Sequence, residues 1–276
     1  MNRQKFSAIL LRILVYFATI VTVGALLFVV GYILYKGVPN LSWKLFEWKY
    51  TTENLSLMPA LLNTILMTAL SLLIAVPLGV FAAIYLVEYA KRGSKLVRVI
   101  RMNAETLAGI PSIVYGLFGM LFFVTALKLG FSMLSGALTI SIMILPVILR
   151  TSEEALMSVP DSYREGSFGL GAGRLRTVFR VVLPDAIPGI LAGVILGVGR
   201  TVGETAALLY TAGTSSDTVS GIMDSARTLS VHMYALSQEG LYINQTYATA
   251  VVLLIIVVGI NALSASLAKR VSKRKI

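Results

Sequence analysis

The sequence predicts an all-α integral membrane protein with six transmembrane helices. Of its 276 residues, 57% are hydrophobic and only 13% are charged, whereas soluble domains are about half apolar and about one-quarter charged. The apolar residues form six long stretches, and Lys and Arg gather at alternating ends of these stretches. Because a soluble core of this size does not hold such an apolar excess, lipid is the expected solvent.

The first apolar stretch, residues 13–35, carries no charged residue and follows a basic N-terminal segment. Its roughly 23 residues rise about 1.5 Å each, enough to cross about 30 Å of hydrocarbon. The stretch is longer than the apolar core of a cleaved signal peptide, so a retained helix is expected. Residues 36–58 mix Trp and Tyr with charged residues, which is typical of a segment beside the headgroups. Residues 1–58 are therefore predicted to be a first transmembrane helix and an extracytoplasmic loop.

Residues 59–276 are predicted to form the transmembrane core, with five further spans. These spans are residues 59–87, 106–127, 132–149, 185–212 and 243–267. Pro77 is expected to kink the first of them. A polar stretch at 157–184 separates the fourth span from the fifth, and residues 213–242 are predicted to be a second outer loop.

Lys and Arg are distributed asymmetrically across these spans. The N-terminal segment, the loop around Lys91, the region from Arg150 to Arg180 and the C-terminal tail hold 18 of the 24 Lys and Arg residues. Cytoplasmic loops are enriched in Lys and Arg, so both termini and the polar stretch 157–184 are predicted to be cytoplasmic. The net charge of +11 then follows from topology, and no nucleic-acid partner is expected.

The polar stretch carries signals for two short helices. Ser162 and Glu165 have the spacing of a capping box, and Gly171 is suited to ending the helix that begins there. A second helical pattern follows and is expected to close at Leu183–Pro184. Its predicted apolar face consists of Leu175, Val178, Phe179 and Val182. Such a shape suits a groove on another protein, and the alternative is a loop lying on the lipid surface.

This stretch resembles the cytoplasmic loop of ABC importer permeases, which has the pattern E-A-A, three residues, G, nine residues, I, one residue, L-P. The matching residues are Glu165, Gly166, Ser167, Gly171, Val181, Leu183 and Pro184. This sequence departs from the pattern at three positions: Gly166 and Ser167 take the place of the two alanines, and Val181 takes the place of the isoleucine. The resemblance implies a type I ABC importer permease fold of the MetI-like kind. It also implies that residues 157–184, here called the coupling loop, dock on a separate ATP-hydrolysing subunit.

Two charged residues, Arg200 and Glu204, interrupt the fifth predicted span. They are four residues apart and would share one face of a continuous helix. Preceding them is a four-residue repeat of small residues that lets helices approach closely, formed by Gly189, Gly193 and Gly197. A charge in mid-membrane is costly, so it usually faces a partner or a water-filled pathway.

Two interpretations of this charged face stay open. In the first, Arg200 and Glu204 form an ion pair that fixes helix registry. In the second, the guanidinium of Arg200 binds two oxygens of a tetrahedral oxyanion in transit. Arg150, at the end of the fourth predicted span, is either a second anion station or an arginine that snorkels to the interface.

Residues 198–207, together with 107–119 and 228–236, resemble the permeases of bacterial phosphate importers, and their PstA-type subunits in particular. The resemblance implies that Arg150, Arg200 and Glu204 take part in phosphate transport. It further implies a complex in the bacterial inner membrane with a PstC-type second permease, two PstB-type ATP-binding subunits and an extracytoplasmic PstS-type phosphate-binding protein. The two predicted outer segments, 36–58 and 213–242, are the expected docking surface for that binding protein.

The sequence offers little for chemistry within the chain itself. It lacks the phosphate-binding pattern G-x-x-x-x-G-K-[ST], so ATP and Mg²⁺ are expected on partner chains and no cofactor on this one. With no Cys and a single His, a metal site is not expected. Glu153 and Glu154 are expected to be solvated. The alternatives are a permease for sulfate or molybdate, an ion-coupled secondary transporter or channel, and a membrane-embedded enzyme, which the absence of a convincing nucleophile or metal cluster disfavours.

Overall fold

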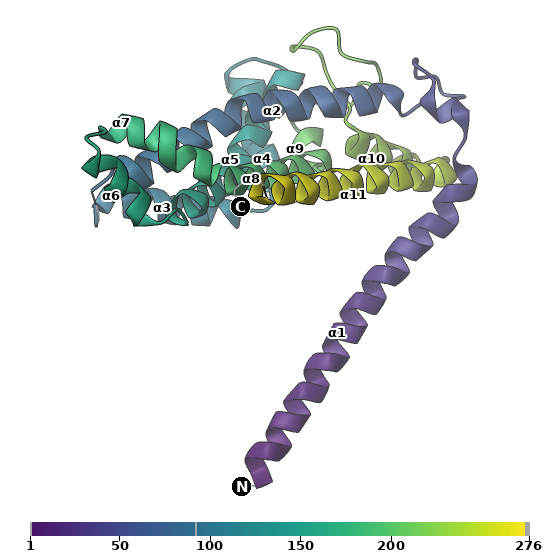
Figure 1. Ribbon diagram of the computed structural model, residues 1–276. Helices are drawn as coiled ribbons and strands as arrows, with labels where there is room; N and C mark the ends of the chain where they lie inside the picture. The colour runs from purple at the N-terminus through teal and green to yellow at the C-terminus, as the bar shows by residue number, and fades with distance from the viewer. Residues whose placement is uncertain (1, 92, 274–276) are drawn as a thin grey trace.

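The computed structural model describes residues 2–91 and 93–273, and the regular elements of these ranges are all helical (Figure 1). Within them, five helices are long and apolar enough to cross a membrane, and one sharply bent pair brings the number to as many as six. The predicted all-α class is therefore confirmed. The last three residues of the basic C-terminal tail, 274–276, lie outside the described residues.

Helix α5 (Met133–Met157) is the central element of the bundle. It packs against α2 (Met58–Ile84) and α8 (Leu183–Val202), and α11 (Ile243–Lys273) packs on α8. Two-thirds of the most apolar 18-residue window of α5 is buried (67%), the largest buried share among the candidate membrane spans of the described residues. Its buried side chains Ile140, Ile144 and Ile148 belong to the largest apolar cluster.

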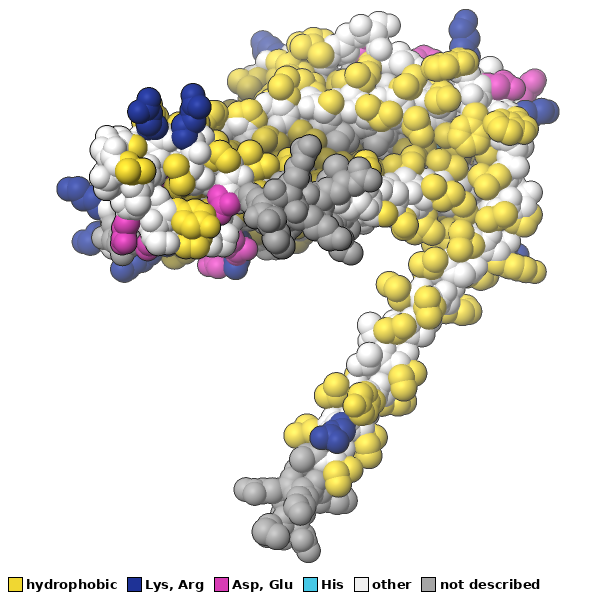
Figure 2. Space-filling model, viewed as in Figure 1, with side chains coloured by type: hydrophobic (Ala, Val, Ile, Leu, Met, Phe, Trp, Pro, Cys, Tyr) yellow, Lys and Arg dark blue, Asp and Glu magenta, His cyan; other side chains and the backbone are white. Residues whose placement is uncertain are grey.

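Helix α1 (Asn2–Gly37) contains the first predicted span but leans away from the bundle (Figure 1). No part of its most apolar 18-residue window is buried. Only its C-terminal end meets α11, where a Cβ atom at Gly37 would lie 2.5 Å from Cγ2 of Val251. In Figure 2 apolar side chains cover this helix, while many of the visible Lys and Arg side chains gather at the end of the bundle that carries the coupling loop.

The segment after α1 contains two short 3-10 turns, Val38–Asn40 and Trp43–Phe46, and keeps both tryptophans, Trp43 and Trp48, exposed. The other predicted outer segment, 213–242, is not a plain loop, because it contains α10 (Leu229–Glu239). Asn63 of α2 fastens this segment by donating hydrogen bonds to the backbone oxygens of Asp217, at 3.0 Å, and Arg227, at 3.3 Å.

The second, fourth and sixth predicted spans correspond to long helices. Helix α2 runs through Pro77 and continues as a π-helical turn, Tyr85–Tyr89. Ser132 caps α5 by accepting a hydrogen bond from the backbone N–H of Ser135 at 3.2 Å, and α5 extends beyond its predicted end at residue 149 to Met157. The sixth span, 243–267, lies within α11.

The third predicted span, 106–127, is a broken helix. Helix α3 (Lys95–Ala108) ends near the start of this stretch, and α4 (Ser112–Gly119) follows it and continues as a π-helical segment, Met120–Ala126. The two helical parts are bent relative to each other by 102°. The break falls at Gly109–Ile110–Pro111. Proline offers no N–H for the helix ladder and disfavours helical geometry in the residue before it, which favours an interruption of the helix at this point.

Candidate coupling loop and anion pathway

The first arm of the coupling loop is helix α6 (Asp161–Gly169), which ends at a glycine as predicted. Gly171 has a φ of +81°, and its N–H donates to the Phe168 oxygen at 2.9 Å. The N–H of Ala172 donates to the Ser167 oxygen at 3.1 Å. These two bonds satisfy carbonyls that a helix end leaves unpaired, and the left-handed conformation at Gly171 is one that other residues adopt at a cost.

The predicted start of this helix is wrong. Pro160 precedes the helix, which begins at Asp161 with no side-chain cap, and Ser162 lies inside its first turn rather than at the capping position. The fixed φ of Pro160 restricts the chain just before the helix, so the helix starts two residues earlier than the Ser-x-x-Glu spacing suggested.

The second arm is not a separate short helix. Helix α7 (Arg174–Thr177) passes through a π-helical turn, Val178–Val182, into α8. Leu183–Pro184 therefore opens α8 instead of closing the loop, because proline is tolerated in the first turn of a helix, where its N–H is not needed.

The predicted apolar face of the second arm splits into two. Val178 and Val182 are fully buried, whereas Leu175 and Phe179 are exposed. Residues four apart share a face, so each pair forms its own stripe and the core takes only one of them. The exposed stripe adds to other large side chains on the loop surface, which are Tyr163, Phe168 and Leu170.

The remaining residues of the loop pattern lie at its surface or at its junction with α8. Glu165, Gly166 and Pro184 are exposed, while Val181 and Leu183 are half-buried. Ser167 joins the two arms through a 2.8 Å hydrogen bond between its Oγ and Oγ1 of Thr177. The arrangement is a braced projection with exposed apolar side chains, and such a surface can occupy a cleft on another protein.

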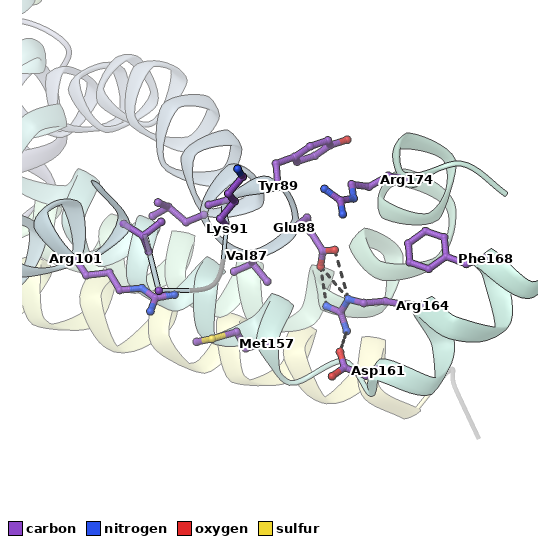
Figure 3. A pocket seen from close by; sticks show the side chains of 14 residues that line it. Val87, Glu88, Tyr89, Lys91, Arg101, Met157, Asp161, Arg164, Phe168 and Arg174 are labelled. Carbon is purple, nitrogen blue, oxygen red and sulfur yellow. Dashed lines mark hydrogen bonds and ion pairs between the residues drawn. The ribbon is translucent and has the colours of Figure 1, made fainter. Parts of the chain in front are cut away.

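A cavity of about 670 Å³ lies between this projection and the adjoining ends of α2 and α3 (Figure 3). Its wall carries four cationic side chains, Lys91, Arg101, Arg164 and Arg174, and two carboxylates, Glu88 and Asp161. Sequence reasoning did not single out Arg164 or Glu88. Both were visible as charged residues beside apolar stretches, but nothing local indicated that they meet.

Helix α8 packs closely on α5 through its glycine repeat. A Cβ atom at Gly189 would lie 2.6 Å from Cβ of Ala155, and one at Gly193 would overlap Oγ1 of Thr151. At Gly197 the nearest atom, Cδ1 of Ile148, is 3.7 Å away, an ordinary contact. The two helices are therefore in direct contact along the first part of this stripe.

These contacts also fix the register between the antiparallel helices. Residue 189 lies opposite 155, residue 193 opposite 151, and residue 197 opposite 148. The same register places Arg200 opposite residues 144–145, midway along α5. Arg150 follows residue 144 by six positions, which at about 1.5 Å per residue puts it about 9 Å nearer the coupling-loop end.

Arg200 and Glu204 do not share a continuous helix, which corrects the geometry expected from their spacing. Helix α8 ends at Val202, and a short helix, α9 (Ala206–Leu209), follows the break. Glu204 is buried in the break, where its Oε1 accepts a 3.0 Å hydrogen bond from the N–H of Ala207. Helix α8 ends here because Gly203 has no side chain to pack and Glu204 satisfies a backbone donor of α9 instead.

Arg200 is half-buried, and the ion pairs among the described residues do not include it. The buried Tyr115 of α4 lies near enough for the guanidinium charge to act on its phenol, whose hydroxyl donates to the Leu107 oxygen at 2.8 Å. Helix α4 reaches this place because Gly116 packs against α9, where a Cβ atom would be 2.9 Å from Cα of Ala207. Two interrupted helical segments thus meet beside Arg200.

Arg150 lies on an exposed face and is held by two carboxylates. It forms ion pairs with Glu154 at 3.0 Å and Glu105 at 3.3 Å. The three residues line a cavity of about 480 Å³ between α3 and α5, which also includes Leu196 of α8. Leu196 precedes Arg200 by one helical turn, so one face of α8 leads from Arg200 into this cavity.

The expectation that Glu153 is solvated is wrong. Its side chain is 9% exposed, and its Oε1 accepts a 2.7 Å hydrogen bond from Nε of Arg101. The pair ties the amphipathic α3 to α5. A buried carboxylate needs such a partner, and the sequence did not reveal which of the five Lys and Arg residues in the loop around Lys91 would serve.

Residues 75–276 match the family described as the binding-protein-dependent transport system inner membrane component. The chain belongs to this family. It is an ABC transporter permease, a membrane-spanning transport component built on a MetI-like fold.

Relatives of known description support the same assignment. The probable ABC transporter permease protein YqgI of Bacillus subtilis is 33% identical over 226 residues, which cover 76% of each chain. The phosphate transport system permease protein PstA 1 of Mycobacterium tuberculosis is 36% identical over 220 residues, covering 78% of this chain and 71% of the relative.

Solved permease structures share the fold. A bacterial alginate ABC transporter, in complex with its alginate-bound periplasmic protein, has a chain that superposes with a TM-score of 0.66 at 15% identity. That match covers 98% of this permease and 96% of the other chain. The MetNI methionine ABC transporter has a chain with a TM-score of 0.56 at 20% identity, covering 78% and 94%.

Proposed function

We propose that this permease is one of two membrane subunits of an ATP-driven importer that moves inorganic phosphate across the bacterial inner membrane. The principal support is the position of Arg200. Its guanidinium is half-buried midway along the central helix and lacks a carboxylate partner among the described residues. A guanidinium keeps its charge at any relevant pH and binds two oxygens of a tetrahedral oxyanion at once.

The substrate route runs from Arg200 toward the coupling-loop end of the bundle. Phosphate leaves Arg200 along the face of α8 that carries Leu196 and enters the cavity between α3 and α5. There Arg150 exchanges its bonds with Glu105 and Glu154 for bonds with the phosphate oxygens. The exposed side chains of this trio make the exchange inexpensive, since surface ion pairs contribute little stability.

Glu204 serves this route by holding the break in place. Its hydrogen bond to Ala207 keeps α9 against α4, and Ser230 of α10 donates to its backbone oxygen at 2.5 Å. The break therefore stays beside Arg200 even when the pathway is empty.

The partners follow from surfaces that the chain leaves uncovered. The exposed apolar surface of α1 suits contact with a second permease of the PstC type. The charged residues of the pathway lie on one face of this chain, so a second permease is needed to line the other side of the pathway. The coupling loop suits a PstB-type ATP-binding subunit, and two such subunits would hold the ATP and Mg²⁺ of the complex. The outer segments 36–58 and 213–242 suit a PstS-type phosphate-binding protein.

An uptake experiment tests the substrate. The complex that purifies with this chain is reconstituted in proteoliposomes, and ATP-dependent uptake of phosphate, sulfate and molybdate is compared. We expect phosphate to be accumulated and the other two anions to be excluded. Accumulation of sulfate or molybdate in its place would identify a different oxyanion importer, and phosphate transport without any ATP-binding subunit would indicate a secondary transporter or channel.

A second experiment tests the coupling loop. Glu165→Lys reverses a charge on its exposed surface and should lower phosphate uptake and stimulated ATP hydrolysis together, because the ATP-binding subunit is no longer held. Arg98→Gln, an exposed change on α3, is the control. Undiminished ATP-driven uptake in Glu165→Lys would contradict the docking role.

A further inference from the structure

One guanidinium joins the coupling loop to the ends of two membrane helices. Arg164 of α6 bonds Glu88 at the end of α2, with Nη2 at 2.7 Å and Nε at 3.1 Å from Oε1 (Figure 3). The two residues are 76 positions apart in the chain. An arginine fork that bonds a carboxylate through two nitrogens fixes orientation as well as distance.

The same guanidinium also bonds the end of α5. Its Nη2 donates to the backbone oxygen of Leu156 at 2.9 Å, and its Nη1 donates to that of Val159 at 2.7 Å. Helix ends leave their last carbonyls without backbone partners, and cationic side chains commonly satisfy them. Arg164 thus caps α5 while it holds α2, and Asp161 completes its bonding at 3.3 Å.

This joint is buried, unlike the surface pairs around Arg150. The side chains of Arg164 and Glu88 are 14% and 7% exposed, respectively. Apolar neighbours Leu86, Leu156 and Val159 are buried around them. Removing either charge would leave the other uncompensated in a poorly solvated place, so the two are held together more firmly than an exposed pair.

We propose that Arg164 is the positioning residue through which displacement of the coupling loop reaches α2, and that it keeps the end of α5 fixed to both. This inference rests on the docking function proposed above. The chain already joins the loop to α8 through α7 and to α5 through residues 158–160. Helix α2 has no such connection, and it meets the loop through apolar packing, the Arg164 joint and the guanidinium of Arg174, which lies 5.9 Å from the ring centre of Tyr89. Through this joint α2, α5 and α8 move as one body, and the stations Arg150 and Arg200 move with them.

The first test measures phosphate moved per ATP hydrolysed, in the reconstituted complex, for Arg164→Gln, Arg164→Lys and Glu88→Gln. Lysine keeps the charge but has a single nitrogen, so it cannot hold Glu88 and both α5 oxygens at once. We expect the ratio to fall about 10-fold in both Arg164 variants, because coupling is lost while hydrolysis continues. Arg98→Gln should leave the ratio unchanged. An unchanged ratio in the Arg164 variants, with uptake and hydrolysis falling together, overturns the proposal.

The second test does not depend on the substrate. Because the chain contains no cysteine, Leu196→Cys places a single thiol in the cavity between α3 and α5. Its labelling by a polar maleimide should change when a non-hydrolysable ATP analogue binds, and Arg164→Gln should abolish that change. A Leu196→Cys complex with Arg164 intact that shows the change, from a permease that carries no phosphate, would contradict the proposed substrate while leaving the joint supported.

A covalent replacement covers the case in which the single variants assemble poorly. Glu88→Cys with Arg164→Cys should be uncoupled, and a bifunctional thiol reagent that spans the two thiols should restore the ratio of phosphate to ATP. The same reagent applied to the cysteine-free permease is the control. Cross-linked complex that stays uncoupled would show that a connection at this point does not transmit the movement.

Discussion

The carboxylate of Glu204 accepts a hydrogen bond from the backbone N–H of Ala207 at 3.0 Å. The residue expected to balance Arg200 within one helix instead joins the end of α8 to the start of α9. This bond predicts a difference between two substitutions. Glu204→Gln keeps an acceptor oxygen and should retain most uptake, whereas Glu204→Ala loses the cap, at about 1 kcal/mol, and should lower it strongly. Equal losses in phosphate uptake assays would assign the effect to charge.

Arg200→Ala should abolish phosphate uptake while the complex still assembles. Losing a charge-assisted contact made through two oxygens should lower uptake by about 100-fold or more. Arg200→Lys keeps the charge but cannot bind two oxygens at once, so its phosphate uptake should lie between that of the wild type and that of Arg200→Ala. Uptake is compared with the amount of complex recovered from detergent, and near-normal transport by Arg200→Ala would remove Arg200 from the route.

The contact between α8 and α5 predicts unequal effects at two glycines. Gly193→Ala should destabilise the complex by about 1–3 kcal/mol, because the new methyl group overlaps Thr151. Gly197→Ala is the matched control, since its methyl group would meet Ile148 at an ordinary 3.7 Å. Thermal unfolding of purified complexes measures the difference, and identical melting temperatures would argue against tight packing on this stripe.

Two glycines of the coupling loop should respond in opposite directions. Gly171→Ala forces a side chain into a left-handed conformation and should cost about 1 kcal/mol or more. Gly166→Ala lies inside α6 with open space around it and should stabilise that helix by about 0.5–1 kcal/mol. Neither new methyl group would meet another atom within 4 Å, so hydrogen exchange of the α6 amides reports the backbone effect directly. Protection that changes in the same direction in both variants would contradict this prediction.

The single histidine predicts a dependence on pH at the opposite end of the bundle. Burial, aided by the charge of Arg227, lowers the pKa of His232 from 6.5 to about 4, and its Nε2 has no hydrogen-bond partner among the described residues. Below pH 6.5 the unfolded chain binds a proton that the folded chain does not. The free energy of unfolding therefore falls as pH drops from 6.5 toward about 4, by up to about 3 kcal/mol.

His232→Gln should remove that part of the pH dependence. Thermal unfolding of the wild-type and variant complexes is compared at neutral pH and near pH 4. The variant should lose less stability than the wild type over this interval. If both lose the same amount, His232 does not titrate in the way its surroundings indicate.

Hydropathy and spacing predicted those parts of the fold that local sequence determines. Residues 132–149 lie in one helix, and Gly171 ends α6, because both features depend on neighbours within a few positions. The break at Pro111 carried a local signal as well, a proline within the third predicted span, but hydropathy alone does not give the angle of the bend. The meeting of Arg164 with Glu88 had no local signal, since it depends on how three helix ends pack.

The interruption at Gly109–Pro111 has a consequence for the surroundings of the protein. Tyr115, one turn beyond, lies near enough to Arg200 for its charge to act on the phenol, and Arg200 lies opposite the middle of α5, so the interruption falls near the middle of the bundle rather than at one of its ends. The first N–H groups of α4 have no partners in their own helix, and fatty-acyl chains cannot provide any. Water or another subunit is therefore needed to satisfy these groups, and bulk lipid cannot lie directly against this flank of the permease.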